Sequence, residues 1–346
     1  MSRVLRSHLR DAIAKLLLVV RATEPACRLR GRLPIITFHR VLPEEERRAY
    51  AMPGLAVTPS ELEWLLCFFG KSFHCGTLAD SVRRAREEPA ADRPSLAITF
   101  DDGQVDNWCH AKPVLDRIGM KASFFVPVES VESGVPLWHD RIAQAVARAS
   151  ARYPSEAARF AREFAPADRA MKPAPHDLVA FAKGLRAEER DRYVERWEEL
   201  AGDGLRPDWD GFMSWEQLRS LSDSGHEIGS HSMSHAILPL CSSEEIVREV
   251  GESRRVLESH LDTSIGSFCY PNGDWDARCI EAVHDSGYQQ AVVTAWGDNP
   301  ARVEKDDRFR LRRFDMQSDH SRDARGNLSR ARLAWRISGF HPGLGS

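Results

Sequence analysis

Leu96-Ala97-Ile98-Thr99-Phe100-Asp101-Asp102-Gly103 is the stretch of the chain that says most about its fold. The apolar run is typical of a buried strand, and the Asp-Asp-Gly that follows predicts a turn. Two adjacent carboxylates are costly to keep charged together unless a metal ion or a proton compensates them. The pair therefore indicates either a chemical site at the end of a strand or a turn whose side chains lie in water.

A second pattern favours the chemical site. Residues 226–230 are typical of a short strand, and they run into His231-Ser232-Met233-Ser234-His235. If this stretch is a helical turn, its two imidazoles share one face and reach one ion. Imidazole with carboxylate suits zinc, and three protein ligands leave one position open for water. Together with the Asp pair, the two histidines predict a metal site.

The third pattern is Ser267-Phe268-Cys269-Tyr270-Pro271-Asn272-Gly273-Asp274-Trp275. Here again an apolar strand ends in a turn, now with aromatic residues on both sides of a Pro-Asn-Gly sequence. Taken alone, this pattern predicts only a strand and a turn.

In this order the three motifs resemble those of the NodB-homology polysaccharide deacetylases, carbohydrate esterase family four, over about residues 33–316. The resemblance implies that Asp101 is a catalytic base. It implies that Asp102, His231 and His235 hold a divalent metal, for which Zn²⁺ is the expected ion. It also implies that the third motif forms one wall of a substrate groove.

Two departures from the family pattern point to one branch of it. The family has an arginine just before the prolines of the third motif, where this chain has Cys269 or Tyr270, and a histidine after a late strand, where residues 309–314 have none. Both departures resemble the branch with F-x-Y-P-x-G and an early Y-H-x-V motif, which includes exopolysaccharide deacetylases acting on poly-N-acetylglucosamine. This chain has Phe38-His39-Arg40-Val41 near its start. By analogy, His39 takes the place of the missing histidine and Arg313 that of the missing arginine.

The resemblance implies metal-dependent hydrolysis of N-acetyl groups from a glycan that contains N-acetylhexosamine, with release of acetate. Asp101 would take a proton from water and His39 would protonate the leaving amine. The expected substrate-binding residues are Tyr270, Pro271, Trp275, Trp296 and Arg313. Each of these aromatic residues either stacks on a sugar ring or belongs to the core.

Three other functions remain open from the sequence. The chain could be a metal-dependent amidohydrolase that acts on a small non-sugar amide, although aromatic residues near the motifs disfavour it. An inactive carbohydrate-binding module would have little need to keep both aspartates with both histidines. A structural protein with a fortuitous motif is the third.

Composition agrees with an enzyme and excludes some partners. The 346 residues allow one large domain with an insertion, or two domains. With 48 Lys and Arg against 51 Asp and Glu, the net charge of −3 gives no global basic field, so nucleic acid is not an expected partner. Seven cysteines without a C-x-x-C pair argue against a disulfide framework and favour a reducing compartment.

The first 32 residues are basic, with eight Arg or Lys against Asp11 and Glu24. Their apolar stretch at residues 16–20 is too short to span a bilayer and has no clear cleavage site, so it is a poor signal peptide. We expect a basic helix that either packs on the domain or lies on an anionic membrane surface. The expected location is accordingly cytoplasmic or peripheral to the membrane.

Strand-like runs alternate with helices that begin at capping boxes, at residues 58–61, 214–217 and 242–245. This rhythm predicts parallel βα units with seven or eight strands, in a barrel or in an open doubly wound sheet. The family resemblance implies a distorted (β/α) barrel. Its carboxyl-terminal strand ends meet on one face, where the motifs would lie together.

The predicted organisation has four parts. Residues 1–32 form the basic helix, residues 33–127 and 212–318 the barrel, residues 128–211 an α-helical insertion rich in Ala, Arg and Glu, and residues 319–346 a C-terminal tail. The insertion includes Trp138 and His139 shortly after a strand end. Both residues are placed where they could approach the site. In the alternative interpretation, Trp138 packs inside the insertion and anchors it. We expect the insertion to tune substrate access without supplying metal ligands.

Overall fold

The computed structural model describes residues 3–164, 174–202, 204, 206–207, 209–304, 307–317 and 319–340. The ends of the predicted terminal segments, residues 1–2 and 341–346, lie outside the described residues. So do residues 165–173, 203, 205 and 208 of the predicted insertion.

Within the described residues, seven parallel strands close into a barrel, in the order β2-β12-β10-β9-β8-β7-β6, and β2 pairs with β6 to complete the ring. An eighth strand, β5, pairs with the first half of β6. The prediction of a barrel with seven or eight strands is confirmed, and the open sheet is wrong. The strands are β2 (Ile35–Phe38), β5 (His74–Gly76), β6 (Ser95–Phe100), β7 (Ser123–Val126), β8 (Glu227–Ser230), β9 (Ser267–Cys269), β10 (Gln290–Trp296) and β12 (Leu311–Asp315).

Alternation along the strands separates two cores. One apolar cluster contains a residue from most of the barrel strands: Ile35, Ala97, Phe125, Cys269, Val292 and Leu311. The alternate residues, such as Ile98 and Phe124, pack in a second and larger cluster with the surrounding helices. By the same alternation, Asp101 falls on the side of Ala97, and Arg313 on the side of Leu311. A charged pair is therefore directed into the barrel.

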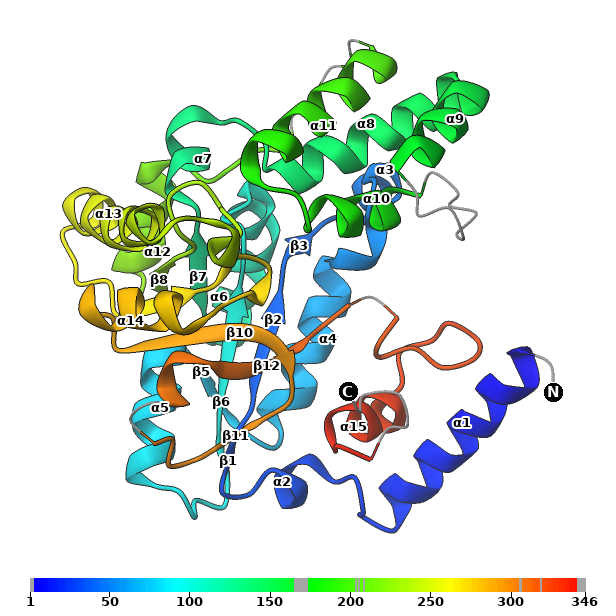
Figure 1. Ribbon diagram of the computed structural model, residues 1–346. Coiled ribbons are helices and arrows are strands. Elements are labelled where there is room, and N and C mark those ends of the chain that lie inside the picture. Colours follow the sequence, from blue (N-terminus) through cyan, green and yellow to red (C-terminus); the bar gives the residue numbers. More distant parts are fainter. Residues whose placement is uncertain are drawn as a thin grey trace.

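Helices run between consecutive strands and cover the outside of the barrel (Figure 1). The predicted capping boxes are present at Thr58, Ser214 and Ser242. The helices are α4 (Pro59–Gly70), α5 (Leu78–Glu87), α6 (Lys112–Ile118), α12 (Trp215–Asp223), α13 (Ser243–Leu261) and α14 (Ala277–Asp285).

Smaller elements connect these units. Two pairs of short strands form separate sheets: β1 (Arg32–Leu33) with β11 (Asn299–Pro300), and β3 (Arg40–Val41) with β4 (Ala56–Val57). The short helical segments are α2 (Pro25–Arg28), α3 (Glu44–Ala49), η1 (Pro53–Leu55), a π-helical turn η2 (Asn107–Ala111), η3 (Leu238–Leu240), η4 (Pro271–Gly273) and η5 (Asp307–Phe309).

The segment predicted as an insertion contains five helices among its described residues, and it has a core of its own (Figure 1). Trp138 packs in that core, and the Arg190 guanidinium lies 4.8 Å from its ring centroid, so Trp138 is a packing residue. The helices are α7 (Val128–Ser133), α8 (Trp138–Arg152), α9 (Pro154–Phe164), α10 (Pro175–Ala182) and α11 (Ala187–Ala201).

A buried arginine fastens this segment to the barrel. The Arg40 guanidinium donates to Asp106 Oδ2 at 2.6 Å and to Asp210 Oδ1 at 2.9 Å. Tyr50, whose ring lies 4.9 Å from the same guanidinium, donates to Asp140 of α8 at 2.9 Å. Because a buried charge needs compensating partners, these bonds fix the insertion relative to β3.

The basic N-terminal segment forms α1 (Arg3–Val19), which packs against α15 (Arg330–Ile337) in the predicted C-terminal tail (Figure 1). Ala14 contacts Ala331 and Trp335 there. One face of α1 is thus packed against another helix of the chain.

Gly229 offers a test of barrel packing. A Cβ built on this residue of β8 lies 2.6 Å from ring atoms of Phe125 and 3.0 Å from the Ser267 carbonyl oxygen. We expect Gly229→Ala to lower the free energy of unfolding by about 1–3 kcal/mol, because the strands must move apart. Urea denaturation measures this change in the free energy of unfolding. Gly54→Ala, whose Cβ meets nothing within 4 Å, is the control, and equal stability of the two variants would contradict the prediction.

Candidate active site

Asp101 and Arg313 form a bidentate ion pair inside the barrel. Arg313 Nη1 donates to Asp101 Oδ1 and Nη2 to Oδ2, each at 2.7 Å. Arg313 also donates to the Val293 carbonyl at 3.0 Å and to Thr37 Oγ1 at 2.9 Å, and its side chain is fully buried. Burial by itself would raise the pKa of Asp101, but the Arg313 charge and its hydrogen bonds bring that pKa below its ordinary value. Asp101 is therefore ionised and fixed in orientation.

Cys269 stands where the family resemblance expects an arginine. Its Sγ lies 3.3 Å from Arg313 Nη2 and 3.6 Å from Asp101 Oδ2. The guanidinium thus reaches the aspartate from β12, which is separated from β9 by β10 alone. This position makes Arg313 a partner of Asp101, and Arg313 does not line the pocket described below.

Asp102, His231 and His235 meet at one point. Asp102 Oδ1 lies 3.4 Å from Nε2 of each histidine, and all three side chains are buried. Those separations exceed an ordinary hydrogen bond, and they match the spacing of about 3.4 Å between ligands of a tetrahedral ion bound at 2.0–2.1 Å. His231 Nδ1 lies 2.8 Å from the Cys269 carbonyl oxygen, which leaves Nε2 to face Asp102. The residues fit a metal site.

A second group with metal-ligand spacing contains Asp101, His231 and Cys269. The Arg313 guanidinium already pairs with Asp101 and contacts the thiol. Since a fixed positive charge opposes a bound cation, the Asp102 group is the better candidate for a metal site.

The two histidines do not come together through a helical turn, as the sequence suggested they would. Residues 231–237 form an irregular loop with positive φ at Ser232 (67°) and His235 (57°). Asp102 also has positive φ, at 73°. Such backbone is uncommon outside glycine and persists only where surrounding contacts impose it, as is frequent at functional sites.

Glu249 of α13 holds this loop, and sequence reasoning missed it. Its carboxylate accepts hydrogen bonds from the backbone N–H groups of Met233 and Ser234 at 3.0 and 2.9 Å, and from the Ser234 hydroxyl at 2.7 Å. A buried glutamate in the middle of an otherwise amphipathic helix was the available signal.

His39 lies at the opening of the site, at the end of β2. Its Nε2 is 3.9 Å from Asp101 Oδ2, and its Nδ1 is 3.8 Å from Asp315 Oδ1. The Asn107 side chain donates to the His39 carbonyl at 2.9 Å. Asp315 is the last residue of β12, and Asp101 directly follows β6, so a search of all strand ends would have found Asp315.

These groups line a cavity of about 280 Å³, which also contains residues that carry no sequence motif. From the insertion come His139, Val179 and Lys183. The rings of His139 and His235 have centroids 5.1 Å apart. Burial lowers the pKa of His139 to about 3, so its imidazole is neutral at pH 7.

The predicted wall residues divide into two groups. Tyr270 lines the cavity, next to the buried Pro271 and to Asn272, whose side-chain nitrogen is buried without a hydrogen-bond partner among the described residues. Trp275 lines a different cavity, close to Arg310. Trp296 packs edge-on against Phe314 and outside the site cavity. The structure therefore does not bring Trp275 or Trp296 to this cavity.

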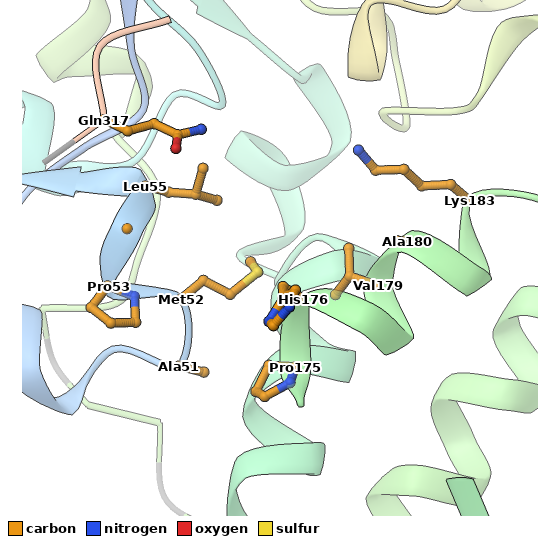
Figure 2. A pocket seen from close by; sticks show the side chains of 11 residues that line it. Ala51, Met52, Pro53, Leu55, Pro175, His176, Val179, Ala180, Lys183 and Gln317 are labelled. Carbon is orange, nitrogen blue, oxygen red and sulfur yellow. The ribbon is translucent and has the colours of Figure 1, made fainter. Parts of the chain in front are cut away.

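A second cavity, of about 430 Å³, adjoins the first (Figure 2). The two share five lining residues: Met52, Leu55, Val179, Lys183 and Gln317. Figure 2 shows the Lys183 and Gln317 side chains at one side of this second cavity, with Pro175 and His176 of α10 at the other. The site therefore continues into a groove between the insertion and the loop around η1.

Comparison with known proteins identifies sequence and structural relatives of this chain. The sequence model of the polysaccharide deacetylase family matches residues 88–291. Chitin deacetylase 1 of Cryptococcus neoformans var. grubii is 32% identical over 91 residues, which are 26% of this chain and 19% of that protein. The putative polysaccharide deacetylase YxkH of Bacillus subtilis is 20% identical over 276 residues, 77% of this chain and 66% of that protein. The chain thus spans less than two thirds of each of these relatives.

A solved structure of similar fold is that of the Streptococcus pyogenes deacetylase PplD in complex with acetate. It superposes with a TM-score of 0.58 at 15% identity, covering 88% of this chain and 98% of that one. At this identity, the likeness shows a common fold.

Breaking the buried ion pair should be costly and pH-dependent. A lowered pKa in the folded state means that Asp101 stabilises the protein above the ordinary aspartate pKa of about 3.9, and that this contribution is lost as the pH falls through the folded value. Arg313→Met leaves a buried carboxylate alone, so we expect a loss of about 3–5 kcal/mol at pH 7. The loss should shrink toward pH 4, where the lone carboxyl takes a proton. Urea denaturation across this range measures both effects.

The matched control is the double variant Asp101→Asn, Arg313→Met, which removes both charges. It should recover a large part of the lost stability. A double variant as unstable as Arg313→Met alone would show that the charge pair is not the cause.

Proposed function

Because the chain belongs to the polysaccharide deacetylase family, we propose that it hydrolyses N-acetyl groups of a glycan containing N-acetylhexosamine, and that it requires a divalent metal, Zn²⁺, to do so. The observation that carries the proposal is the pairing of two groups in one cavity. An ionised carboxylate held by Arg313 lies beside the buried Asp102, His231 and His235 cluster.

The metal would be held by Asp102, His231 and His235. When bound, Zn²⁺ supplies Lewis acidity, which polarises an amide carbonyl and makes water a better nucleophile. Asp101 is proposed as the general base, since Arg313 keeps it ionised and directed at the cavity. The unpartnered amide nitrogen of Asn272 is available to donate to a substrate oxygen.

His39 is proposed as the proton donor to the leaving nitrogen. Water forms the new C–O bond, Asp101 accepts its proton, and the C–N bond breaks as His39 protonates the amine. An imidazolium at His39 would face two carboxylates, Asp101 and Asp315. The neutral His139 is less suited to donate a proton at pH 7. Acetate and a free amino sugar result.

The length of the groove favours a glycan over a small amide. The site cavity of about 280 Å³ adjoins one of about 430 Å³, so there is room for more than the reacting sugar. Stacking by Trp275 or Trp296 is not part of the proposal, because neither lines the site cavity. Contacts beyond the reacting sugar are proposed for Lys183 and Gln317.

Metal content should distinguish the proposed roles of Asp101 and Asp102. We expect Asp102→Asn, His231→Ala and His235→Ala each to lose most of the bound metal, since three ligands leave little redundancy. Asp101→Asn should keep its metal and lose turnover, assayed as acetate release from N-acetylglucosamine oligomers. Elemental analysis after dialysis gives the metal-to-protein ratio. An empty site in Asp101→Asn together with a full site in Asp102→Asn would exchange the two roles.

His39→Ala should lower kcat by about 10² to 10⁴, with metal content and unfolding free energy unchanged. His139→Ala is the matched comparison, because this histidine lies in the same cavity but comes from the insertion. Near-normal turnover in His39→Ala with a large loss in His139→Ala would move the proton donor to the insertion. If wild-type protein with full metal content releases no acetate from any N-acetylated glycan, the inactive binding module becomes the better description.

A further inference from the structure

Helix α1 has two apolar faces, and only one of them is covered. Ala14, with Leu17 and Leu18, packs against α15. On the other side lies a stripe spaced by three or four residues, as one helix face requires. We call it the α1 stripe, and its members are between 37% and 79% exposed: Leu9, Ile13, Leu16 and Val19 of the helix, and Val20 directly after it.

The charged residues of α1 also differ between its exposed face and its packed face. Arg6 and Lys15 are exposed and lie on the two sides of the α1 stripe, at about 100° of rotation per residue. The only acidic residue of the helix, Asp11, faces the domain, where it pairs with Arg332 at 3.0 Å and accepts from the Ala324 N–H at 2.9 Å. The exposed half of α1 therefore combines apolar side chains with positive charge alone.

Beside α1 lies a small cavity of about 140 Å³, which we call the arginine pocket. It is lined by Arg10 of α1 and by Asp319, His320, Arg322, Arg332 and Arg336. Arg332 pairs with Asp11, and Arg322 with Glu61. Among the described residues, Arg10 and Arg336 form no ion pair with a carboxylate, and Arg336 instead donates to His320 Nε2 at 2.7 Å. These two arginines outnumber Asp319, the one carboxylate in the lining, so the pocket keeps net positive charge that suits a phosphate group.

We propose that α1 docks the protein on a bilayer that contains anionic phospholipids. The α1 stripe enters the boundary between headgroups and acyl chains, while Arg6, Lys15 and the arginine pocket face lipid phosphates. A second copy of the chain is a poorer occupant, because stripe against stripe would bring the flanking cations together. None of the described helices is long and apolar enough to cross a bilayer.

Vesicle co-sedimentation of the full-length chain tests the proposal. Wild-type protein should sediment with phosphatidylcholine vesicles containing about 30% phosphatidylglycerol and bind pure phosphatidylcholine much less, with binding weakened by salt. Leu9→Gln with Leu16→Gln should reduce binding by tenfold or more, since two apolar side chains leave the interface. Val247→Gln, equally exposed but on α13, should bind as wild type does.

A second pair of variants tests the charges. Arg6→Ala with Arg10→Ala should weaken binding to anionic vesicles only, whereas Arg255→Ala, an exposed arginine of α13, should not. Metal content should stay unchanged in every variant.

Three results would overturn the proposal. One is no binding of wild-type protein to anionic vesicles. Another is binding of inorganic phosphate that needs Arg10, without vesicle binding, which would indicate a site for a free anion. The third is a wild-type dimer in analytical ultracentrifugation that becomes a monomer in the Leu9→Gln, Leu16→Gln variant, which would make a second copy the occupant.

Discussion

The ion pair between Arg313 and Asp101 is the interaction on which the site depends. Its two residues lie on β12 and at the end of β6, and β2 lies between these strands and pairs with both. The charges therefore meet only when the barrel has closed, and a buried charge without its partner is strongly destabilising. The same ion pair therefore requires the closed barrel and orients Asp101, the proposed base. Cys269 takes part in the same constraint, because its small side chain leaves room for the guanidinium between β9 and β12.

Loops at the strand ends orient the side chains of the site, and contacts with other elements hold these loops in place. Asp102 and His235 need left-handed backbone to turn their ligand atoms toward one point. Glu249 of α13 pins the loop between the two histidines, and the Cys269 carbonyl orients His231. Rigid strands and fixed loops thus give the Asp102, His231 and His235 group its geometry, and packing elsewhere must balance the local backbone strain.

The helical insertion and the pair of α1 and α15 lie outside the barrel, and they contribute to different surfaces of the molecule. The helical insertion is bound through Arg40, the residue next to His39, and it brings His139 and Lys183 to the cavity. The expectation that it carries no metal ligand stays a prediction, since His139 lies close to His235. The pair of α1 and α15 contributes nothing to that cavity and instead presents the α1 stripe and the arginine pocket.

The sequence by itself determined the strands, the capped helices and the three motifs, because alternation, capping boxes and strand-end turns are local properties of the chain. It also identified Asp101, Asp102, His231 and His235, which the structure brings together. Only the tertiary structure decided between a barrel and an open sheet, since that choice rests on the pairing of β2 with β6. It decided as well that Arg313 serves Asp101, that Trp275 and Trp296 lie outside the cavity, and that α1 keeps one apolar face exposed. Each of these depends on contacts between segments far apart in the chain, which no local pattern records.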